Sequence, residues 1–262
     1  MVRLVAVDMD GTFLDDNKKK SPEFGKVLNA LKDRGVTFCV ASGRQMASIK
    51  DEFAGYEEGI VFISDNGTVI DIEGTTYCIS MFEEDLSKQI LNTLKSMPDK
   101  KTVYCGVEYS YIDSDDELSI RNAKLYLPKH AIVKDFFEID EPPVKISVYS
   151  ENGYDSDFKQ LQDKFSDVAT ICTSGFEWLD IVPKGSSKGV ALKRAQEILG
   201  IPKEECMAFG DQMNDFDMLN QVYYSYAMEN AVDEIKQISR YTAPSNNEYG
   251  VITVLKEFFG IE

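Results

Sequence analysis

The chain has 262 residues, of which 43% are hydrophobic and 28% are charged, a balance typical of a folded globular protein rather than a disordered one. The formal net charge of −17 argues against a nucleic-acid groove or an anionic membrane surface as the main partner. The first apolar stretch is too short for a signal peptide and no apolar segment has the length of a transmembrane helix, so we expect a cytoplasmic protein.

Short apolar runs alternate with helical patterns at the start of the chain, as is typical of strand–helix–strand units with a parallel sheet. We expect the first strand over 2–7 and a helix that begins with Pro22 and closes at Gly35. Further strands are predicted over 36–41 and 60–63, and they end in the sequences SGR and SDNG.

The pattern of apolar and helical segments changes after about Met81. Roughly 100 residues follow, which is a typical size for a domain. The elements predicted there are helices over 84–97 and 156–165 and strands over 170–172 and 178–182. Alternating, tyrosine-rich stretches between them indicate further strands, so this segment is predicted to be an α+β unit.

The strand–helix pattern returns with a helix that ends at Gly200 and a strand over 206–209. We therefore predict an α/β protein whose core is a Rossmann-like, doubly wound parallel sheet. The core would consist of residues 1–82 and 184–262, and residues 83–183 would form an inserted α+β domain.

Reactive side chains follow the predicted core strands. Asp8 and Asp10 come after the first strand, Ser42 after the second, Asn66 after the third and GDQMND after the last. Side chains beyond the carboxyl ends of parallel strands gather in the crevice where the strand order reverses. Lys188 opens the helix that precedes the last of these strands, so we expect it in the same group.

Two carboxylates as close in sequence as Asp8 and Asp10 repel each other, and burying both is costly unless a cation lies between them. Carboxylate and carbonyl oxygens suit Mg²⁺. We therefore expect Mg²⁺ to be held by the Asp8 carboxylate, the Asp10 carbonyl and Asp211. The remaining negative field is expected to keep the Asp10 side chain protonated.

Phosphoryl transfer is the reaction that these groups fit. Asp8 is predicted to be the nucleophile that forms an aspartyl-phosphate. Asp10 is placed to protonate the leaving oxygen and later to deprotonate water. Ser42 and Lys188 offer a hydroxyl and a positive charge to the phosphoryl oxygens, and Thr12 can fix the turn after Asp10.

The sequence resembles the haloacid dehalogenase superfamily of aspartate-nucleophile phosphatases, and within it the Cof-type group, over nearly the whole chain. The resemblance rests on DMDGTFL, ASGR, SDNGTVI, WLDIVPKGSSKGVAL, GDQMNDFDML and AMENAVDEIKQISRYTAPSNNEYGV. It implies the roles given above for Asp8, Asp10, Ser42, Lys188 and Asp211. It also implies that the inserted domain is a cap, which closes over the site and selects the substrate.

The same resemblance implies a wider set of site residues. Asp215 is expected in the outer metal shell or holding Lys188, and Asn214 and Asn66 near the substrate or its phosphate. One departure is Asp180, where relatives often carry Glu, and this affects the junction with the cap rather than the chemistry. The predicted substrate and phosphate contacts are Thr12, Ser42, Gly43, Arg44, Asn66, Lys188 and Asn214. The predicted metal ligands are Asp8, Asp10, Asp211 and Asp215.

Structural roles compete with functional ones at two of these positions. Arg44 is equally compatible with a contact to the substrate and with capping of the helix that follows it. Asn66 precedes a glycine, a pair typical of turns, so a turn is the more common reason for an asparagine there.

The leading prediction is a Mg²⁺-dependent phosphatase that hydrolyses small phosphorylated metabolites, with sugar phosphates as the first expectation. A phosphomutase or phosphotransferase on the same scaffold is the alternative, because only the acceptor that discharges the aspartyl-phosphate differs. A signalling receiver phosphorylated on aspartate is disfavoured, because Asp10 beside the phosphate would promote its turnover. We predict no nucleic-acid or membrane partner, and the sequence does not indicate an oligomeric state.

Overall fold

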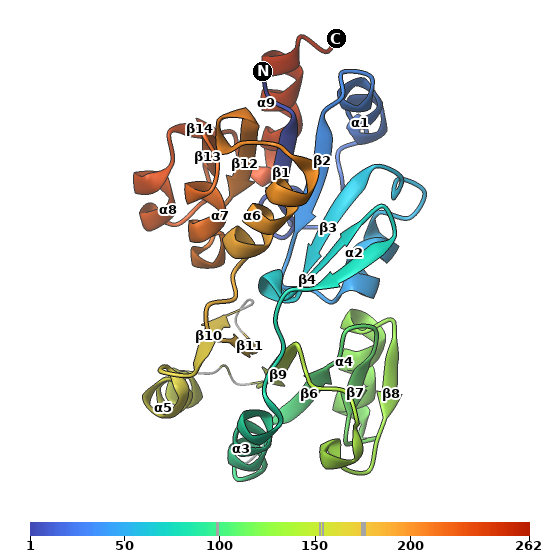
Figure 1. Cartoon of the computed structure of the whole chain (residues 1–262), viewed down its shortest axis with the longest axis vertical. Coiled ribbons are helices and arrows are strands. Elements are labelled where there is room, and N and C mark those ends of the chain that lie inside the picture. The colour runs from blue at the N-terminus through green and yellow to red at the C-terminus, as the bar shows by residue number, and fades with distance from the viewer. Residues whose placement is uncertain (98–99, 152, 154, 174–176) are drawn as a thin grey trace.

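The structure is a computed structural model that describes residues 1–97, 100–151, 153, 155–173 and 177–262. Within these residues the chain forms an 8-stranded sheet and a 6-stranded sheet. Figure 1 shows the larger sheet with its helices in the upper part of the molecule and the smaller one below it. The chain leaves the larger sheet after its strand β5 and returns through β11, so the smaller sheet is an insertion.

The larger sheet has its first strand in the interior, with later strands added on both sides. In spatial order its strands are β14 (Tyr241–Ala243), β13 (Tyr224–Met228), β12 (Cys206–Gly210), β1 (Leu4–Asp8), β2 (Thr37–Ala41), β3 (Ile60–Ser64), β4 (Val69–Ile72) and β5 (Thr75–Cys78). Leu4 of β1 pairs in parallel with Cys206 on one side and with Thr37 on the other. The strand order therefore reverses at β1, and the crevice at its carboxyl end is where a ligand site is expected.

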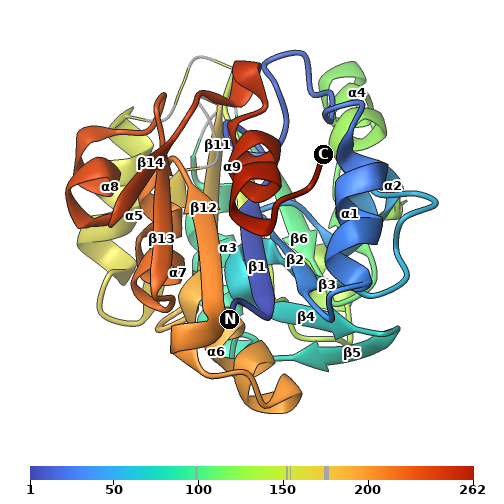
Figure 2. The same cartoon turned by 90° about the horizontal axis from the view of Figure 1, so that it is seen from above.

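Helices cover both faces of the larger sheet, which confirms the predicted doubly wound core. They are α1 (Phe24–Lys32), α2 (Met46–Glu52), α6 (Lys188–Leu199), α7 (Phe216–Asn220), α8 (Asp233–Ile238) and α9 (Gly250–Phe259). Figure 2 shows α1 and α9 on one face and α6 on the other. Because both faces are covered, every residue of Leu4–Asp8 is buried, the carboxylate of Asp8 included.

One edge of this sheet is antiparallel, and the sequence prediction did not include it. β3 pairs antiparallel with β4, and β4 pairs antiparallel with β5. Glu73 and Gly74 connect β4 to β5, and both have positive φ, the conformation that two-residue hairpin turns require. The sequence prediction recognised SDNG as a strand end and missed the hairpin behind it.

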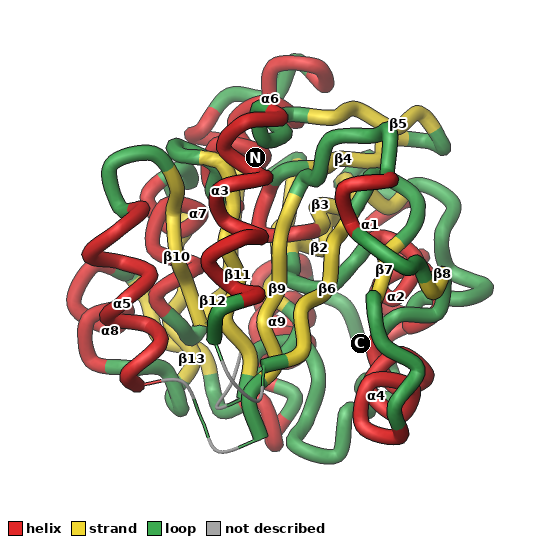
Figure 3. Tube along the Cα trace, turned by 90° about the horizontal axis from the view of Figure 1, so that it is seen from below, coloured by secondary structure: helices red, strands yellow, loops and turns green. Residues whose placement is uncertain are grey.

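The smaller sheet confirms the predicted α+β character of the insertion. In spatial order its strands are β10 (Ala169–Thr173), β11 (Trp178–Pro183), β9 (Lys145–Tyr149), β6 (Lys101–Cys105), β7 (Ser110–Ile112) and β8 (His130–Ile132). Its helices are α3 (Glu84–Lys95), α4 (Glu117–Tyr126) and α5 (Asp155–Phe165). Figure 3 shows α3 and α5 in front of the strands when the molecule is viewed from below. The exact division into residues 1–82 with 184–262 and 83–183 stays a prediction.

Alternation along the strands of the smaller sheet decides which side chains face the core. Ile146 and Val148 of β9 belong to a buried apolar cluster with α3 and α5. Successive side chains of a strand point to opposite faces, so Lys145 and Ser147 lie on the other face, toward the larger sheet. A charged residue is thereby directed into the junction between the two sheets.

Short 3-10 helices complete the described chain: η1 (Asp65–Gly67), η2 (Phe136–Glu138), η3 (Lys203–Glu205), η4 (Met213–Asp215) and η5 (Asn246–Glu248). Two of them, η1 and η4, follow strands β3 and β12 and carry predicted site residues. In the described part of the chain, none of the helices combines the length and the apolar character that crossing a bilayer requires.

Candidate active site

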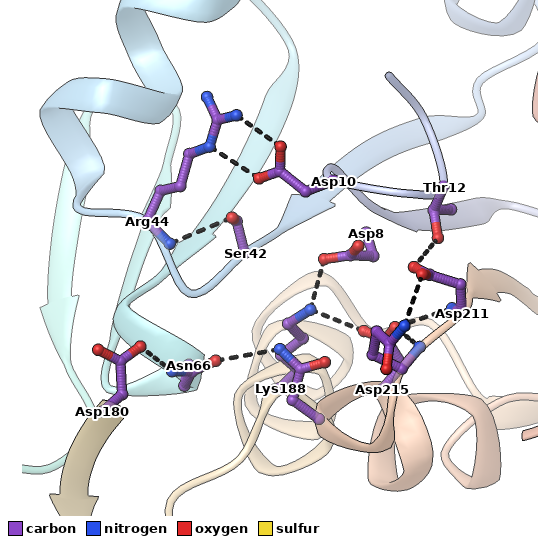
Figure 4. Close-up of polar contacts among 12 residues, drawn as sticks. Asp8, Asp10, Thr12, Ser42, Arg44, Asn66, Asp180, Lys188, Asp211 and Asp215 are labelled. Carbon is purple, nitrogen blue, oxygen red and sulfur yellow. Dashed lines mark hydrogen bonds and ion pairs between the residues drawn. The ribbon is translucent and has the colours of Figure 1, made fainter. Parts of the chain in front are cut away.

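The centre of the site is a buried ion pair between the first strand and the helix α6. Ser187 caps this helix by accepting a hydrogen bond from the backbone N–H of Val190, so that Lys188 begins its first turn. The side chain of Lys188 is buried, and its Nζ donates to Asp8 Oδ1 at 2.5 Å and to Asp215 Oδ1 at 2.7 Å (Figure 4). The carboxylates raise the pKa of Lys188 despite its burial, so its ammonium stays charged.

Three buried carboxylates surround this ammonium group. Oxygen atoms of Asp8, Asp211 and Asp215 lie within 4.8 Å of one another. Burial and the neighbouring charges of Asp215 and Asp211 raise the pKa of Asp8 well above its ordinary value. Burial and Asp215 raise the pKa of Asp211 to about 6. One ammonium does not balance three carboxylates, so this all-oxygen set fits a hard divalent cation such as Mg²⁺.

The loop after β1 packs directly on Asp211. Gly11 has a φ of +83°, and a Cβ atom on it would lie 2.4 Å from Asp211 Oδ2, so only glycine fits this turn. The hydroxyl of Thr12 donates to Asp211 Oδ1 at 2.8 Å. The side chain of Thr12 thus holds a carboxylate of the candidate metal site, and its predicted contact with phosphate stays a prediction.

Asp215 shapes the loop after β12 as well as holding Lys188. Its second oxygen, Oδ2, accepts hydrogen bonds from the backbone N–H groups of Asp211 at 3.0 Å and Gln212 at 3.1 Å. Of the two positions expected for Asp215, the contact with Lys188 is therefore present, and its carboxylate also belongs to the metal-site cluster.

Asp10 lies beside the cluster and its carboxylate is paired with two cations. Arg44 donates from Nε to Asp10 Oδ2 at 2.8 Å and from NH2 to Oδ1 at 2.6 Å (Figure 4). Lys18 donates to Asp10 Oδ1 at 2.7 Å. Burial raises the pKa of Asp10, but the hydrogen bonds and charges of Arg44 and Lys18 outweigh it and lower the pKa.

The expectation that Asp10 stays protonated is therefore wrong for this arrangement. Burial and the neighbouring carboxylates raise the pKa values of Asp8 and Asp211. At Asp10 the bidentate cation Arg44 lowers the pKa instead. The guanidinium of Arg44 is engaged by Asp10 and does not cap the helix α2 that follows it, and a contact of Arg44 with the substrate stays a prediction.

The SGR segment forms the loop after β2. Ser42 is buried, and its Oγ accepts a hydrogen bond from the backbone N–H of Arg44 at 3.1 Å. The carbonyl oxygen of Gly43 accepts a hydrogen bond from Lys145 Nζ at 2.6 Å. This loop is thus held from within by Ser42 and from the smaller sheet by Lys145.

Asn66 occupies a turn and also bridges the two sheets. Its φ of 55° places it in the left-handed region, which confirms the turn expected of an Asn-Gly pair. Its Nδ2 donates to Asp180 Oδ2 at 2.9 Å, and its Oδ1 accepts from Asn214 Nδ2 at 3.4 Å. Asp180 thus contacts a predicted site residue directly, as Figure 4 shows.

Four residues at the site were not found from the sequence: Lys18, Asp65, Lys145 and Asn230. Asn230 donates to the carbonyl oxygen of Gly11 at 2.7 Å and so holds the loop after β1. A signal was available for Lys145, because it is a charged residue in a strand that is otherwise buried. For Lys18 and Asp65 no local pattern distinguishes them from ordinary loop residues.

Comparison with known proteins shows the family to which this chain belongs. A family model described as haloacid dehalogenase-like hydrolase matches residues 5–255, so the chain belongs to that family. The predicted membership of the haloacid dehalogenase family is confirmed, and with it the enzyme class of a phosphatase.

Named relatives and solved structures align with this chain over most of their length. The chain is 30% identical over 257 residues to 5-amino-6-(5-phospho-D-ribitylamino)uracil phosphatase YbjI of Escherichia coli, covering 97% of this chain and 95% of YbjI. It is 30% identical over 246 residues to an HMP-PP phosphatase of Yersinia pseudotuberculosis, covering 90% and 87%. The structure of SMU.1108c from Streptococcus mutans aligns with a TM-score of 0.88 at 28% identity, over 99% of this chain and 100% of that one. TM0651 from Thermotoga maritima aligns with a TM-score of 0.85 at 26% identity, over 98% and 97%.

Proposed function

We propose that this protein is a Mg²⁺-dependent phosphomonoesterase that acts on small phosphorylated metabolites through an aspartyl-phosphate on Asp8. The observation that carries the proposal is the buried cluster in which Lys188 contacts Asp8 and Asp215 while Asp211 lies beside them. The relatives named above act on a phosphorylated ribitylaminouracil and on HMP-PP, which supports a small phosphorylated substrate. Sugar phosphates are the first class to test.

In the first step a carboxylate oxygen of Asp8 attacks phosphorus, and the bond from phosphorus to the leaving oxygen breaks. Lys188 and the hydroxyl of Ser42 are proposed to bind the phosphoryl oxygens, on which negative charge is spread. The leaving alkoxide takes a proton from Asp10. Asp10 is paired as a carboxylate with Arg44 in this structure, so before this step it must leave that cation and take up a proton from solvent.

In the second step Asp10 serves as the base. Its carboxylate takes a proton from a water molecule, the water oxygen attacks phosphorus, and the bond between phosphorus and Asp8 breaks to release inorganic phosphate. Arg44 and Lys18 hold Asp10 in the ionised form that this step requires.

Asp8 and Asp211 would hold Mg²⁺ together with the carbonyl oxygen of Asp10. Asp215 would belong to the outer shell of the metal and would orient Lys188. When bound, the cation supplies positive charge that offsets the carboxylates and the incoming phosphate.

We further propose that residues 83–183 form a cap domain and that residues 1–82 and 184–262 form the catalytic core. The contacts of Asp180 with Asn66 and of Lys145 with Gly43 bring the smaller sheet against the predicted phosphate-binding loops, which supports a role in selecting the substrate.

The test is the release of p-nitrophenol from p-nitrophenyl phosphate with and without Mg²⁺, for the wild type and Asp8→Asn. We expect Mg²⁺-dependent release that is abolished in Asp8→Asn, because an amide is not a nucleophile. Asp51→Asn, which changes an exposed carboxylate on α2, is the matched control and should keep full activity. An active, folded Asp8→Asn protein, or a wild type without turnover on this compound and on a panel of sugar phosphates, would contradict the proposal.

A further inference from the structure

A buried cation with no part in the steps above lies between the two sheets. Lys145 begins strand β9 and is only 5% exposed. It lies on the face of β9 opposite Ile146 and Val148, which are buried under α3 and α5. An ammonium group is rarely buried unless it is paired, so its partners indicate why it is placed there.

The two shortest contacts of Lys145 reach loops of the candidate site, and a longer one reaches Asp180 on β11 of its own sheet. Its Nζ donates to the carbonyl oxygen of Gly43 at 2.6 Å and lies 3.1 Å from Asp65 Oδ1. Asp180 Oδ2 lies 3.8 Å away, so Asp180 adds charge rather than a short hydrogen bond. Asp65 is completely buried, and Lys145 therefore supplies the charge that compensates its carboxylate.

Gly43 and Asp65 belong to two loops that are also joined to each other by the backbone. The N–H of Asp65 donates to the carbonyl oxygen of Arg44 at 3.0 Å, and the N–H of Asn66 donates to that of Ser42 at 3.1 Å. One ammonium group of the smaller sheet thus spans the loops that follow β2 and β3. These loops carry Ser42, the proposed phosphoryl contact, and Arg44, the partner of Asp10.

We propose that Lys145 is a positioning residue, which fixes the 42–44 loop through the Gly43 carbonyl and so makes the geometry of the phosphate site depend on the seating of the smaller sheet. This inference rests on the proposed function, because its consequence for the reaction acts through Ser42 and Arg44. Lys145 is not assigned any contact with the reacting atoms.

Removing Lys145 alone is a poor test, because Asp65 would be left as a buried, uncompensated charge and the protein could fail to fold. The informative variant is therefore the double substitution Lys145→Met with Asp65→Asn, which removes both charges at nearly constant volume. Asp65→Asn alone keeps the hydrogen bond from Lys145 to Gly43, so it separates loss of the ion pair from loss of the loop contact.

A second lysine–aspartate pair, in which the Lys50 side chain is 37% exposed against 7% for Lys145, provides the control. Lys50 Nζ lies 2.8 Å from Asp71 Oδ2, and this pair joins α2 to β4 without contacting the 42–44 loop. Lys50→Met with Asp71→Asn makes the same change in charge and composition. It reports what the loss of a core ion pair does by itself.

The experiment measures kcat/KM for p-nitrophenyl phosphate, inhibition by inorganic phosphate, and amide hydrogen exchange of the peptides that cover 42–44 and 65–66. In the Lys145/Asp65 double variant we expect kcat/KM to fall and the inhibition constant for phosphate to rise, each by at least about tenfold. Exchange at the amides of Arg44, Asp65 and Asn66 should become faster by a similar factor. The Lys50/Asp71 control should stay within about threefold of the wild type in all three, and Asp65→Asn alone should change each of them less than the double variant does.

A folded Lys145/Asp65 double variant with wild-type kinetics and phosphate inhibition would overturn the inference and leave the proposed function intact. If the wild type itself released no p-nitrophenol, the proposed function would fail, and hydrogen exchange would decide the positioning role alone. Unchanged exchange at 42–44 and 65–66 in the double variant would then refute it.

Discussion

Lys188 Nζ lies 2.5 Å from Asp8 Oδ1, although 180 residues separate the two along the chain. Asp8 ends the first strand, and Lys188 opens the first helix after the chain has returned from the smaller sheet. The inserted segment therefore lies in sequence between Asp8 and Lys188, two residues whose side chains are in contact. Any displacement of α6 relative to β1 separates the proposed nucleophile from the cation that we propose binds the phosphoryl group.

Replacement of Asp10 tests the proton transfers. Asp10→Asn keeps the shape of the side chain but cannot donate or accept the proton, so turnover should fall by at least about 10²-fold. Rapid quenching after mixing with substrate, followed by measurement of phosphate bound to protein, would separate the two steps. Formation and breakdown of the aspartyl-phosphate at wild-type rates in Asp10→Asn would rule out the assigned role.

Removal of the metal tests the carboxylate cluster. EDTA should silence p-nitrophenyl phosphate hydrolysis and Mg²⁺ should restore it, because Asp8, Asp211 and Asp215 offer oxygen atoms only. Zn²⁺ prefers nitrogen and sulfur ligands, so it is expected to restore much less activity. Restoration by Zn²⁺ and not by Mg²⁺ would contradict the assignment of a hard-ion site.

The pKa of Asp211 predicts how the stability of the metal-free protein depends on pH. Its pKa is about 6 in the folded protein and about 3.9 in an unfolded chain. Between these values the folded protein holds a proton that the unfolded chain has released, so this group lowers the free energy of unfolding as the pH rises through the interval. Above pH 6 the penalty is complete, at roughly 3 kcal/mol.

Asp211→Asn removes this titration and keeps an oxygen for Thr12. In EDTA the free energy of unfolding of Asp211→Asn, measured in urea relative to the wild type, should therefore increase between about pH 4 and pH 7. Because each value is a difference between two proteins at one pH, the other titrating groups largely cancel. A difference that does not vary with pH would show that Asp211 is ionised at its ordinary pKa.

Gly67 tests the close approach between η1 and α6. A Cβ atom on Gly67 would lie 2.1 Å from the backbone oxygen of Ser187, the cap residue directly before Lys188. Gly67→Ala should therefore displace the start of α6, lower the free energy of unfolding by at least about 3 kcal/mol and reduce kcat/KM by about 10²-fold or more.

Gly74→Ala is the control for backbone strain. Gly74 has a φ of +80°, close to the +94° of Gly67, but an added Cβ would meet nothing within 4 Å. Gly74→Ala should lower the free energy of unfolding by about 1 kcal/mol and leave the activity unchanged. Equal effects of the two substitutions in thermal and kinetic measurements would show that strain, and not the contact with Ser187, sets the consequence at Gly67.

The strand-end motifs predicted the site from local patterns alone. An apolar run before Asp8, an asparagine before Gly67 and a capped helix at Lys188 are features that neighbouring residues determine, so they can be recognised without knowing the fold. The parallel sheet followed from their alternation with helices, since that order permits few architectures. The β4–β5 hairpin was missed, although its strands VIDI and TTYC are rich in β-branched residues and only Glu73 and Gly74 separate them.

The sequence by itself determined the residue types of the site, the order of the elements and the family to which the chain belongs. Only the tertiary structure decided which charges meet. Arg44 pairs with Asp10 and lowers its pKa, and Lys145 of the smaller sheet contacts Gly43. The physical reason is that electrostatic pairing depends on distances of a few ångströms between groups far apart in the chain, and these distances are fixed only when the two sheets pack.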